Sequence, residues 1–144
     1  MNNEVMFSSK KDDWGTPQEL FDELDAEFHF TVDLCADDKN HKCERYYTKE
    51  NDGMKADLTG EVVFFNPPYG RKSTSEWIKK CAEAKALSVM LLPARTDTKA
   101  FHEYIWEKAE VRFLRGRLKF VGGGIPNSAP FPSMIVVFRN GEEL

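Results

Sequence analysis

The sequence feature that most constrains the fold is the stretch VVFFNPPYGRK at residues 62–72, an apolar run that stops at two prolines. Val62–Phe65 consists only of β-branched and aromatic residues, which is typical of a strand covered on both faces. Pro67 and Pro68 each remove a backbone donor and restrict φ, so the strand must end there. The stretch therefore predicts a buried strand that ends abruptly between an amide side chain and an aromatic ring.

Segments with helical periodicity alternate with further apolar runs along the chain. Thr16 and Pro17 have the pattern of an N-cap followed by the first helical residue. Strands that alternate with helices indicate an α/β fold with a mainly parallel sheet and helices on both faces. The predicted helices are residues 17–28, 73–87 and 98–109. The predicted strands are a short strand within residues 28–36 that ends near Asp33, residues 62–65 and 87–93, a short strand at 46–48 and a terminal β-hairpin across 111–139.

Composition limits the class of protein. The 144 residues suffice for one domain, which we expect to span residues 1–144 with residues 1–12 loosely held. The hydrophobic content of 41% and the charged content of 31% are those of a soluble globular protein. No apolar run approaches the ~20 residues of a membrane span, and the N-terminus lacks the apolar core of a signal peptide. We therefore expect a cytoplasmic protein.

The three cysteines do not form a disulfide framework. Cys35, Cys43 and Cys81 make an odd count, so the sequence favours reduced thiols in a cytoplasmic protein. Cys35, His41 and Cys43 lie close together in the sequence, but zinc requires four ligands and no fourth is evident. The sequence therefore predicts no metal site.

The net charge of −4 argues mildly against a protein that binds nucleic acid without specificity. The charges are unevenly distributed, however, because residues 111–121 contain basic but no acidic side chains. Two interpretations of such a stretch are open: contact with a polyanion, or a solvated strand edge whose cations discourage aggregation. The basic residues of this stretch and of a second small cluster are Arg112, Arg115, Arg117 and Lys119, and Arg71 and Lys72.

Polar residues follow three of the predicted strands, at residues 33–36, 66–69 and 93–97. Ligands of open α/β sheets bind outside the carboxyl ends of the strands. At one of these ends, the Asn66 amide oxygen and the Pro67 carbonyl offer two convergent acceptors for an amino group with two hydrogens. Tyr69 offers a ring for stacking on a planar partner.

A nucleobase with an exocyclic amine meets both demands. Two acceptors that pull on its hydrogens favour the pyramidal amine, whose lone pair can attack, and such preorganised dipoles also stabilise the transition state. The base would be extruded from its stack. Taken in isolation, the tetrapeptide is also compatible with a turn in which Asn66 caps the backbone and Tyr69 belongs to the core.

Asn-Pro-Pro-Tyr after an apolar strand resembles the catalytic motif of the S-adenosylmethionine-dependent amino-methyltransferases that act on adenine N6 or cytosine N4. The ordered set WGTPQELFDEL, VDLCAD, VFFNPPYG, LLPARTDTKAFH, RGRLKF and SAPFPSMIVVF resembles the phage-type DNA N6-adenine methyltransferase family across residues 14–138. The resemblance implies an abbreviated Rossmann-like methyltransferase sheet. It also implies methyl transfer from S-adenosylmethionine to double-stranded DNA, in the host cytoplasm for a phage protein, which would protect that DNA from restriction.

The resemblance assigns roles to the residues that match the motifs. Asn66, Pro67, Pro68 and Tyr69 would be catalytic, holding and stacking the adenine. Residues expected around S-adenosylmethionine are Trp14, Thr16, Pro17, Asp33, Cys35, Ala36, Asp57 and Asn66. Residues expected beside the DNA substrate are Arg71, Lys72, Arg95, Thr96, Asp97, Arg112, Arg115, Arg117 and Lys119.

The sequence departs from the broader methyltransferase pattern in two respects. The segment DLCADDKN replaces the usual glycine-rich cofactor loop, and the short chain leaves no room for a separate target-recognition domain. Sequence choice is therefore expected from residues 37–60 and 121–133 or from oligomerisation. Two alternative functions stay open: the same chemistry on cytosine N4, RNA adenine or a protein glutamine, and a catalytically degenerate relative that only binds nucleic acid.

Overall fold

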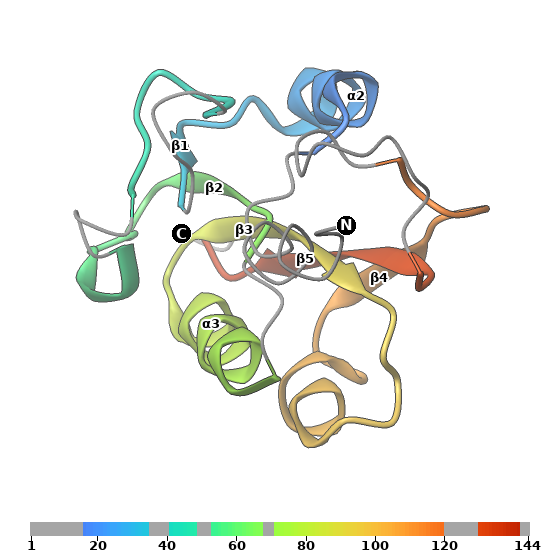
Figure 1. The fold of residues 1–144 in the computed structure, drawn as a ribbon. Helices are drawn as coiled ribbons and strands as arrows, with labels where there is room; N and C mark the ends of the chain where they lie inside the picture. The colour runs from blue at the N-terminus through green and yellow to red at the C-terminus, as the bar shows by residue number, and fades with distance from the viewer. Residues whose placement is uncertain (1–15, 35–40, 49–52, 68–70, 120–129, 142–144) are drawn as a thin grey trace, which may run out of the picture.

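The computed structural model shows a central β-sheet between two helical layers (Figure 1). It describes residues 16–34, 41–48, 53–67, 71–119 and 130–141. The described helices are α2 (Gln18–Phe28), α3 (Arg71–Glu83), the 3₁₀ turn η2 (Gly53–Lys55) and the π-helical segment η3 (Phe101–Ile105). The described strands are β1 (Val32–Asp33), β2 (Val62–Phe65), β3 (Leu87–Pro93), β4 (Glu110–Phe113) and β5 (Ser133–Arg139).

The sheet is mixed, whereas the sequence predicted a mainly parallel one. The strand order is β1-β2-β3-β5-β4, in which β1, β2 and β3 are parallel and β5 is antiparallel to both β3 and β4. The predicted terminal hairpin is confirmed, because β4 and β5 pair with Phe113 opposite Met134. Strand β5 is buried along six of its residues, so it needs a neighbour on each side, whereas the half-exposed β4 can lie at the edge.

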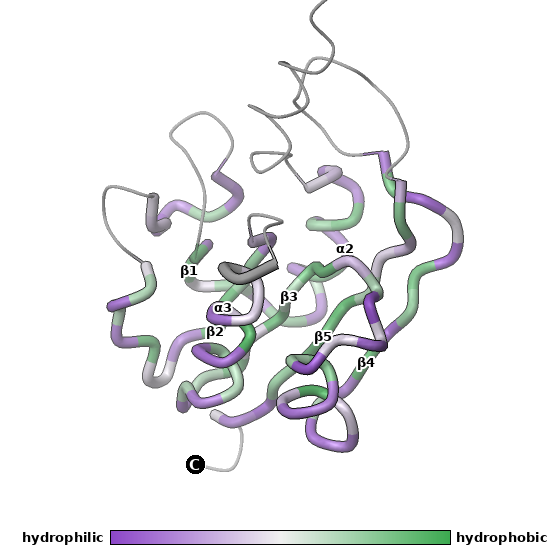
Figure 2. The backbone as a smooth tube through the Cα atoms, turned by 60° about the horizontal axis from the view of Figure 1, so that its bottom comes forward, coloured by the Kyte–Doolittle hydropathy of each residue, from purple (hydrophilic) through white to green (hydrophobic). Residues whose placement is uncertain are grey.

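Helices cover both faces of the sheet, as predicted. On one face, Phe21, Leu24 and Phe28 of α2 pack against Phe64 and the neighbouring strands. On the other face, side chains of α3 and η3 pack against the alternate positions of the same strands, such as Val63. Figure 2 shows the central strands β3 and β5 as largely hydrophobic along their length. The alternation of side chains along each strand thus builds two cores from one sheet.

The helix boundaries differ from the predicted ones. Helix α2 begins at Gln18, with Pro17 in the N-cap position and no side-chain cap, so Thr16 is not the predicted N-cap. Helix α3 begins and ends earlier than predicted, at Arg71 and Glu83. These shifts matter for the site, because they place Thr16 outside the helix and start α3 directly after the Asn-Pro-Pro-Tyr-Gly segment.

The third predicted helix is much shorter than residues 98–109. It ends at Ile105, because Trp106 has a ψ of 122° and Glu107 has a φ of 63°, neither of which continues a helix. Phe101 and Ile105 are buried, and Tyr104 packs against the same core. Trp106 remains 56% exposed, so Tyr104 rather than Trp106 is the additional inward residue. No helix within the described ranges is long and apolar enough to span a bilayer.

Candidate active site

Polar side chains gather at the edge of the sheet where β1, β2 and β3 end, on the face that α2 covers. Thr16, Asp33 and Ser133 are buried there with exposed fractions of 2%, 3% and 1%, and Asn66 is half-buried. Strand alternation explains the common face: Phe64 packs toward α2, so Asn66, two residues later, falls on the same side. This edge is where ligands bind in open α/β sheets.

The amide of Asn66 is held by a residue far away in the sequence. Its Nδ2 donates a hydrogen bond of 3.0 Å to Oγ1 of Thr16. Thr16 therefore uses its hydroxyl to orient the amide instead of capping α2, and the two motifs predicted as cofactor-binding and catalytic meet here. Because Nδ2 points to Thr16, the amide oxygen lies on the other side of the amide carbon. Pro67 is buried beside it, while Pro68 and Tyr69 lie outside the described residues.

Asp33 ends β1 as a buried carboxylate. Its Oδ2 accepts a hydrogen bond of 3.1 Å from the backbone N–H of Lys42, and its main chain bonds with Arg45 and Tyr47. The predicted strand at 46–48 is reduced to a single bridge between Asp33 and Tyr46. A carboxylate in this position fits the hydroxyl groups of a nucleoside-like cofactor. The neighbouring predictions, Cys35 and Ala36, and likewise Trp14, fall outside the described ranges.

The Cys43 thiol lies close to this carboxylate. Burial raises the pKa of Cys43 to about 12, with smaller contributions from the charges of Asp33 and Asp25. The thiol therefore stays protonated at neutral pH and is a poor nucleophile. Within the described ranges, no three His, Cys, Asp or Glu side chains are grouped so that they could hold a metal ion.

Asp57 is not brought to this edge. It precedes β2, whereas Asn66 follows the strand, so the two residues lie at opposite ends of it. The Asp57 side chain is exposed, and its Oδ1 accepts a hydrogen bond of 3.0 Å from the N–H of Thr59. This bond lowers the pKa of Asp57. In the structure Asp57 stabilises a turn, and it is separated from the other residues expected around the cofactor.

A cavity of about 480 Å³ opens beside the end of β3, between the first turns of α3 and η3. This volume is within the range of small-molecule sites. Arg95 and Asp97 line it, and Thr96 is exposed in the same turn. The cavity lies on the face of α3 and η3, opposite the face of Asn66, so the expected place of these three residues beside the substrate stays a prediction. Its floor is apolar and includes Leu92 and Met134. Sequence reasoning missed four further polar residues of its wall, which are Thr74, Ser75, Thr98 and Lys99.

Three of these residues had a signal in the sequence. Thr74 and Ser75 follow the tetrapeptide directly and belong to the start of α3. Thr98 caps the next segment, because its Oγ1 accepts a hydrogen bond of 3.1 Å from the N–H of Phe101 and donates one of 3.2 Å to the carbonyl of Arg95. The Thr-Asp-Thr pattern after a strand is a typical start signal for a helix.

The predicted DNA-contacting cations have different surroundings. Arg71 and Lys72 form the start of α3, and their side chains are outside the description. The side chains of Arg115, Arg117 and Lys119 are exposed in the segment after β4.

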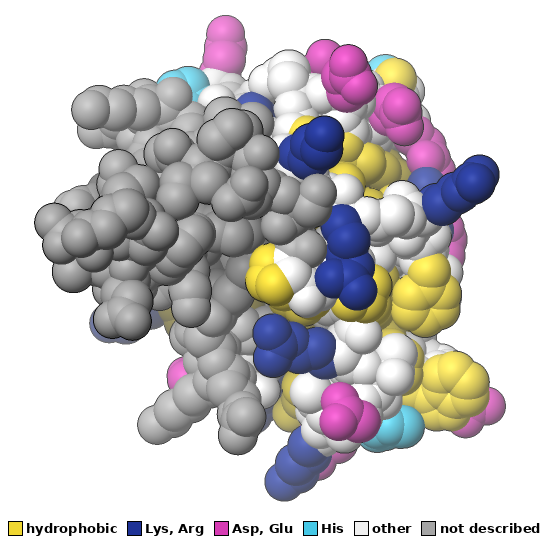
Figure 3. Space-filling view, turned by 45° about the vertical axis from the view of Figure 1, so that its right-hand side comes forward, with side chains coloured by type: hydrophobic (Ala, Val, Ile, Leu, Met, Phe, Trp, Pro, Cys, Tyr) yellow, Lys and Arg dark blue, Asp and Glu magenta, His cyan; other side chains and the backbone are white. Residues whose placement is uncertain are grey.

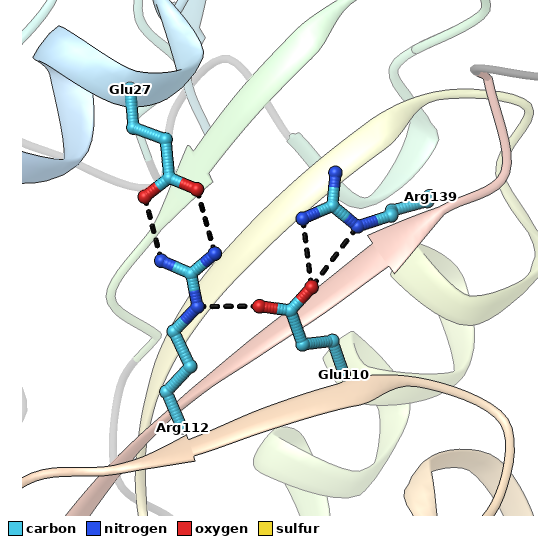
Figure 4. A network of polar contacts seen from close by, with 4 residues as sticks. All are labelled: Glu27, Glu110, Arg112 and Arg139. Carbon is cyan, nitrogen blue, oxygen red and sulfur yellow. Dashed lines mark hydrogen bonds and ion pairs between the residues drawn. The ribbon is translucent and has the colours of Figure 1, made fainter.

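Arg112 differs from the other cations, because two carboxylates neutralise it (Figure 4). Its guanidinium donates two hydrogen bonds of 2.7 Å to Glu27 of α2 and a third to Glu110, which also pairs with Arg139 at 2.7 Å. Hydrogen bonding to Glu27 and Glu110 raises the pKa of Arg112. The position of Arg112 on the α2 face of β4, 5.4 Å from the ring centre of Phe28, explains this pairing. The expected phosphate contact of Arg112 is therefore not available in this arrangement.

Known proteins resemble this chain over most of its length. The sequence profile of the DNA N-6-adenine-methyltransferase (Dam) family matches residues 4–143. A DNA N-6-adenine-methyltransferase of Escherichia phage T1 is 30% identical, with 78% of this chain and 55% of the relative covered. A DNA N-6-adenine-methyltransferase of Haemophilus phage HP1 is 28% identical, with 91% of this chain and 80% of the relative covered. The mixed sheet is consistent with an abbreviated Rossmann-like methyltransferase fold. The chain belongs to the DNA N-6-adenine-methyltransferase (Dam) family.

Proposed function

We propose that this protein transfers a methyl group from S-adenosylmethionine to N6 of adenine in double-stranded DNA. The observation that supports this most directly is the hydrogen bond between Asn66 and Thr16 at the carboxyl end of β2. The bond orients the Asn66 amide, which the reaction requires, and it connects Asn66 to the segment around Thr16, which is expected to contact the cofactor. Membership of the family indicates the reaction class and the substrate.

The protein's own contribution is positioning and electrostatic stabilisation. The Asn66 oxygen and the Pro67 carbonyl accept the two hydrogens of the adenine amine, which directs its lone pair along the line of transfer. These dipoles are in place before the reaction and stabilise the positive charge that develops on nitrogen. As the N–C bond forms, the bond between the methyl carbon and the sulfonium sulfur would break and leave a neutral thioether. The methylated nitrogen would then carry a positive charge and release one proton to solvent, and because a cationic amine of this kind is acidic, a strong general base is not required. Tyr69 would stack on the extruded base.

The cofactor supplies the reactive methyl group on a sulfonium when it is bound. Asp33 would hold it through the buried carboxylate, and Thr16 and Pro17 would border it from the start of α2. The sequence resemblance adds three residues to this proposed site, which are Trp14, Cys35 and Ala36. On the DNA side we retain the expected contacts without Arg112: Arg71, Lys72, Arg95, Thr96, Asp97, Arg115, Arg117 and Lys119.

The central test is Asn66→Ala, measured with labelled S-adenosylmethionine and unmethylated DNA followed by nucleoside analysis. Loss of one preorganised group of this kind lowers kcat by roughly 10²–10³-fold. We expect a loss of this size, with thermal unfolding and cofactor binding retained. Methylation at the parent rate would contradict the assigned mechanism.

Thr16 provides a matched pair of variants. Thr16→Ser keeps the hydroxyl that accepts from Asn66 and should retain most of the activity, whereas Thr16→Val removes the acceptor and should lose part of it. Equal activities would show that the bond does not orient the amide. Analysis of the labelled product also tests the substrate. N4-methylcytosine as the product would make cytosine the acceptor, and label found in RNA or protein alone would exclude adenine in DNA.

A further inference from the structure

Two large hydrophobic side chains are mostly exposed among the described residues. Trp106 is 56% exposed after η3, and Phe113 is 64% exposed at the end of β4. Single exposed apolar residues are common on protein surfaces and need no special explanation. The two residues differ, however, in the charges that surround them.

Phe113 is followed by three exposed cations, Arg115, Arg117 and Lys119. None of these forms an ion pair with a carboxylate in the described part of the chain. The segment is nevertheless anchored, because Leu114 donates a backbone hydrogen bond of 3.0 Å to Ser133. Leu114 and Leu118 also pack against the core on the α2 face. An exposed aromatic ring is thus presented by a strand end whose outward-facing charges are all positive.

Trp106 has a different electrostatic setting. The nearby exposed side chains include Glu103 and Glu107, and Lys108 is held by the carbonyl of Glu103. The Trp106 ring also lies 6.2 Å from the ring of Phe101. Figure 3 shows hydrophobic, basic and acidic side chains on the side of the molecule that carries β4. Among the described residues, Trp106 and Phe113 are the large aromatic side chains that are mostly exposed, and Phe113 is the one followed by cations that pair with no described carboxylate.

The register of the sheet places Phe113 at the same level along the strands as the candidate active site. Its side chain follows Val111 on the face of α3 and η3, whereas Asn66 lies on the face of α2, so the two residues share one end of the sheet but not one face. Phe65 pairs with Met90, Met90 with Val136 and Val136 with Val111, so these residues form one row across the sheet. Two positions further toward the same edge, the row contains Pro67 and Phe113. The strands β2 and β4 are three spacings apart, which is roughly 14 Å. DNA advances about 3.4 Å per base pair, so this distance corresponds to roughly four base pairs.

We propose that Phe113 is the base-stacking residue of a DNA-docking surface at the end of β4, which we define as Phe113, Arg115, Arg117 and Lys119. The three cations contact phosphates, and the ring contacts bases within a few base pairs of the target adenine. Interleaved aromatic and basic side chains are the usual means of binding unstacked nucleic acid, and apolar rings also insert between base steps. We assign DNA as the partner because the three cations of the surface are opposite in charge to the phosphates of DNA. The choice of DNA as the partner rests on the proposed function.

The test compares Phe113→Ala with Trp106→Ala in the full chain, using fluorescence anisotropy of a labelled unmethylated duplex. Stacking of one base on an aromatic residue predicts that Phe113→Ala weakens DNA binding between about five-fold and about 150-fold. The slope of log affinity against log salt should not change, because no charge is removed. Trp106→Ala should stay within about two-fold of the parent. Phe113→Trp keeps an aromatic ring and should bind DNA about as tightly as the parent.

Several outcomes would overturn the proposal. Parent-like DNA binding by Phe113→Ala would exclude a specific stacking role, and so would an equal loss of binding in Trp106→Ala. If Phe113→Ala instead changes the sedimentation of the protein, the surface contacts a second copy of the chain. DNA binding is measured without methyl transfer, so a chain that binds DNA through Phe113 but methylates nothing would refute only the proposed function.

Discussion

Arg112 and the three cations that follow it belong to one basic stretch of sequence, but their surroundings are opposite. The Arg112 guanidinium is held between Glu27 and Glu110 and lies over the ring of Phe28. Arg115, Arg117 and Lys119 are exposed, and no described carboxylate pairs with them. The difference begins with strand geometry: Arg112 lies within β4 and faces α2, whereas the other three follow the end of the strand.

This comparison separates two uses of positive charge. The cluster Glu27–Arg112–Glu110–Arg139 joins α2 to β4 and β5, so its ion pairs stabilise the contact between these elements. Its position also matters for the site, because α2 begins two residues after Thr16, whose hydroxyl orients Asn66. The cations after β4 remain able to interact with a polyanion. The two groups should therefore respond differently to substitution.

The largest effect is expected from the triple substitution Arg115→Ala, Arg117→Ala and Lys119→Ala. If each cation contacts one phosphate, the slope of log affinity against log salt should decrease by about 0.9 for each. Thermal unfolding should not change, because these side chains are exposed. The measurement is DNA binding across a series of salt concentrations.

A control of equal charge replaces Lys55, Lys79 and Lys85 with alanine. These lysines are exposed, and Lys79 and Lys85 line a separate depression that also contains Asp57, away from the candidate site. An equal change of the salt slope in this control would show that net charge, and not the surface after β4, attracts DNA.

The next effect is expected from Arg112→Met, which should lower the free energy of unfolding by about 1–2 kcal/mol. The substitution keeps much of the side-chain volume but leaves Glu27 and Glu110 close together without the cation between them. Urea unfolding measures the change, and the salt slope of DNA binding should remain that of the parent. Arg45→Met, which breaks the exposed pair of Arg45 and Glu61, should cost less. A reduced salt slope in Arg112→Met would remove the distinction between the two groups.

The smallest effect is a pH dependence of stability in Glu110→Gln. Hydrogen bonds from Arg139 and Arg112 lower the pKa of Glu110 below its ordinary value of 4.5. A carboxyl with a lowered folded pKa stabilises the protein above its unfolded pKa and loses this contribution as the pH falls through the folded value. The parent should therefore be more stable than Glu110→Gln at pH 7, and the difference should shrink below about pH 4.5.

Urea unfolding at a series of pH values would measure this difference, with the exposed Glu76→Gln as the control. A difference between the parent and Glu110→Gln that stays constant down to pH 3 would mean that the ion pairs of Glu110 do not contribute to stability.

Much of the local structure could be predicted from the pattern of residues. The apolar runs predicted β2 and β3, and the amphipathic spacing predicted α2, because periodicity and burial are local properties of the sequence. The shortened η3 could not be predicted in this way. Its pattern continues to Trp106, but the chain leaves helical geometry there and reaches the start of β4 at Glu110.

The candidate site was predicted only in part. The tetrapeptide and Asp33 were found because polar groups at strand ends are visible in the sequence, and the structure places Asn66 and Asp33 at one edge of the sheet. Asp57 has the same residue type but lies at the other end of β2, which its place before the predicted strand at 62–65 already indicates. Thr16 matched a helix cap equally well, and its partner Asn66 is too distant along the chain for a local pattern to indicate.

The sequence by itself determined which segments form strands and helices and where β2 must stop, because proline chemistry and side-chain periodicity act within a few residues. Only the tertiary structure decided that β5 lies between β3 and β4, that Thr16 holds Asn66, and that two carboxylates neutralise Arg112 while no described carboxylate pairs with the three cations after it. Each of these depends on contacts between residues far apart in the chain. Such contacts follow from the packing of both sheet faces together, so no single segment encodes them.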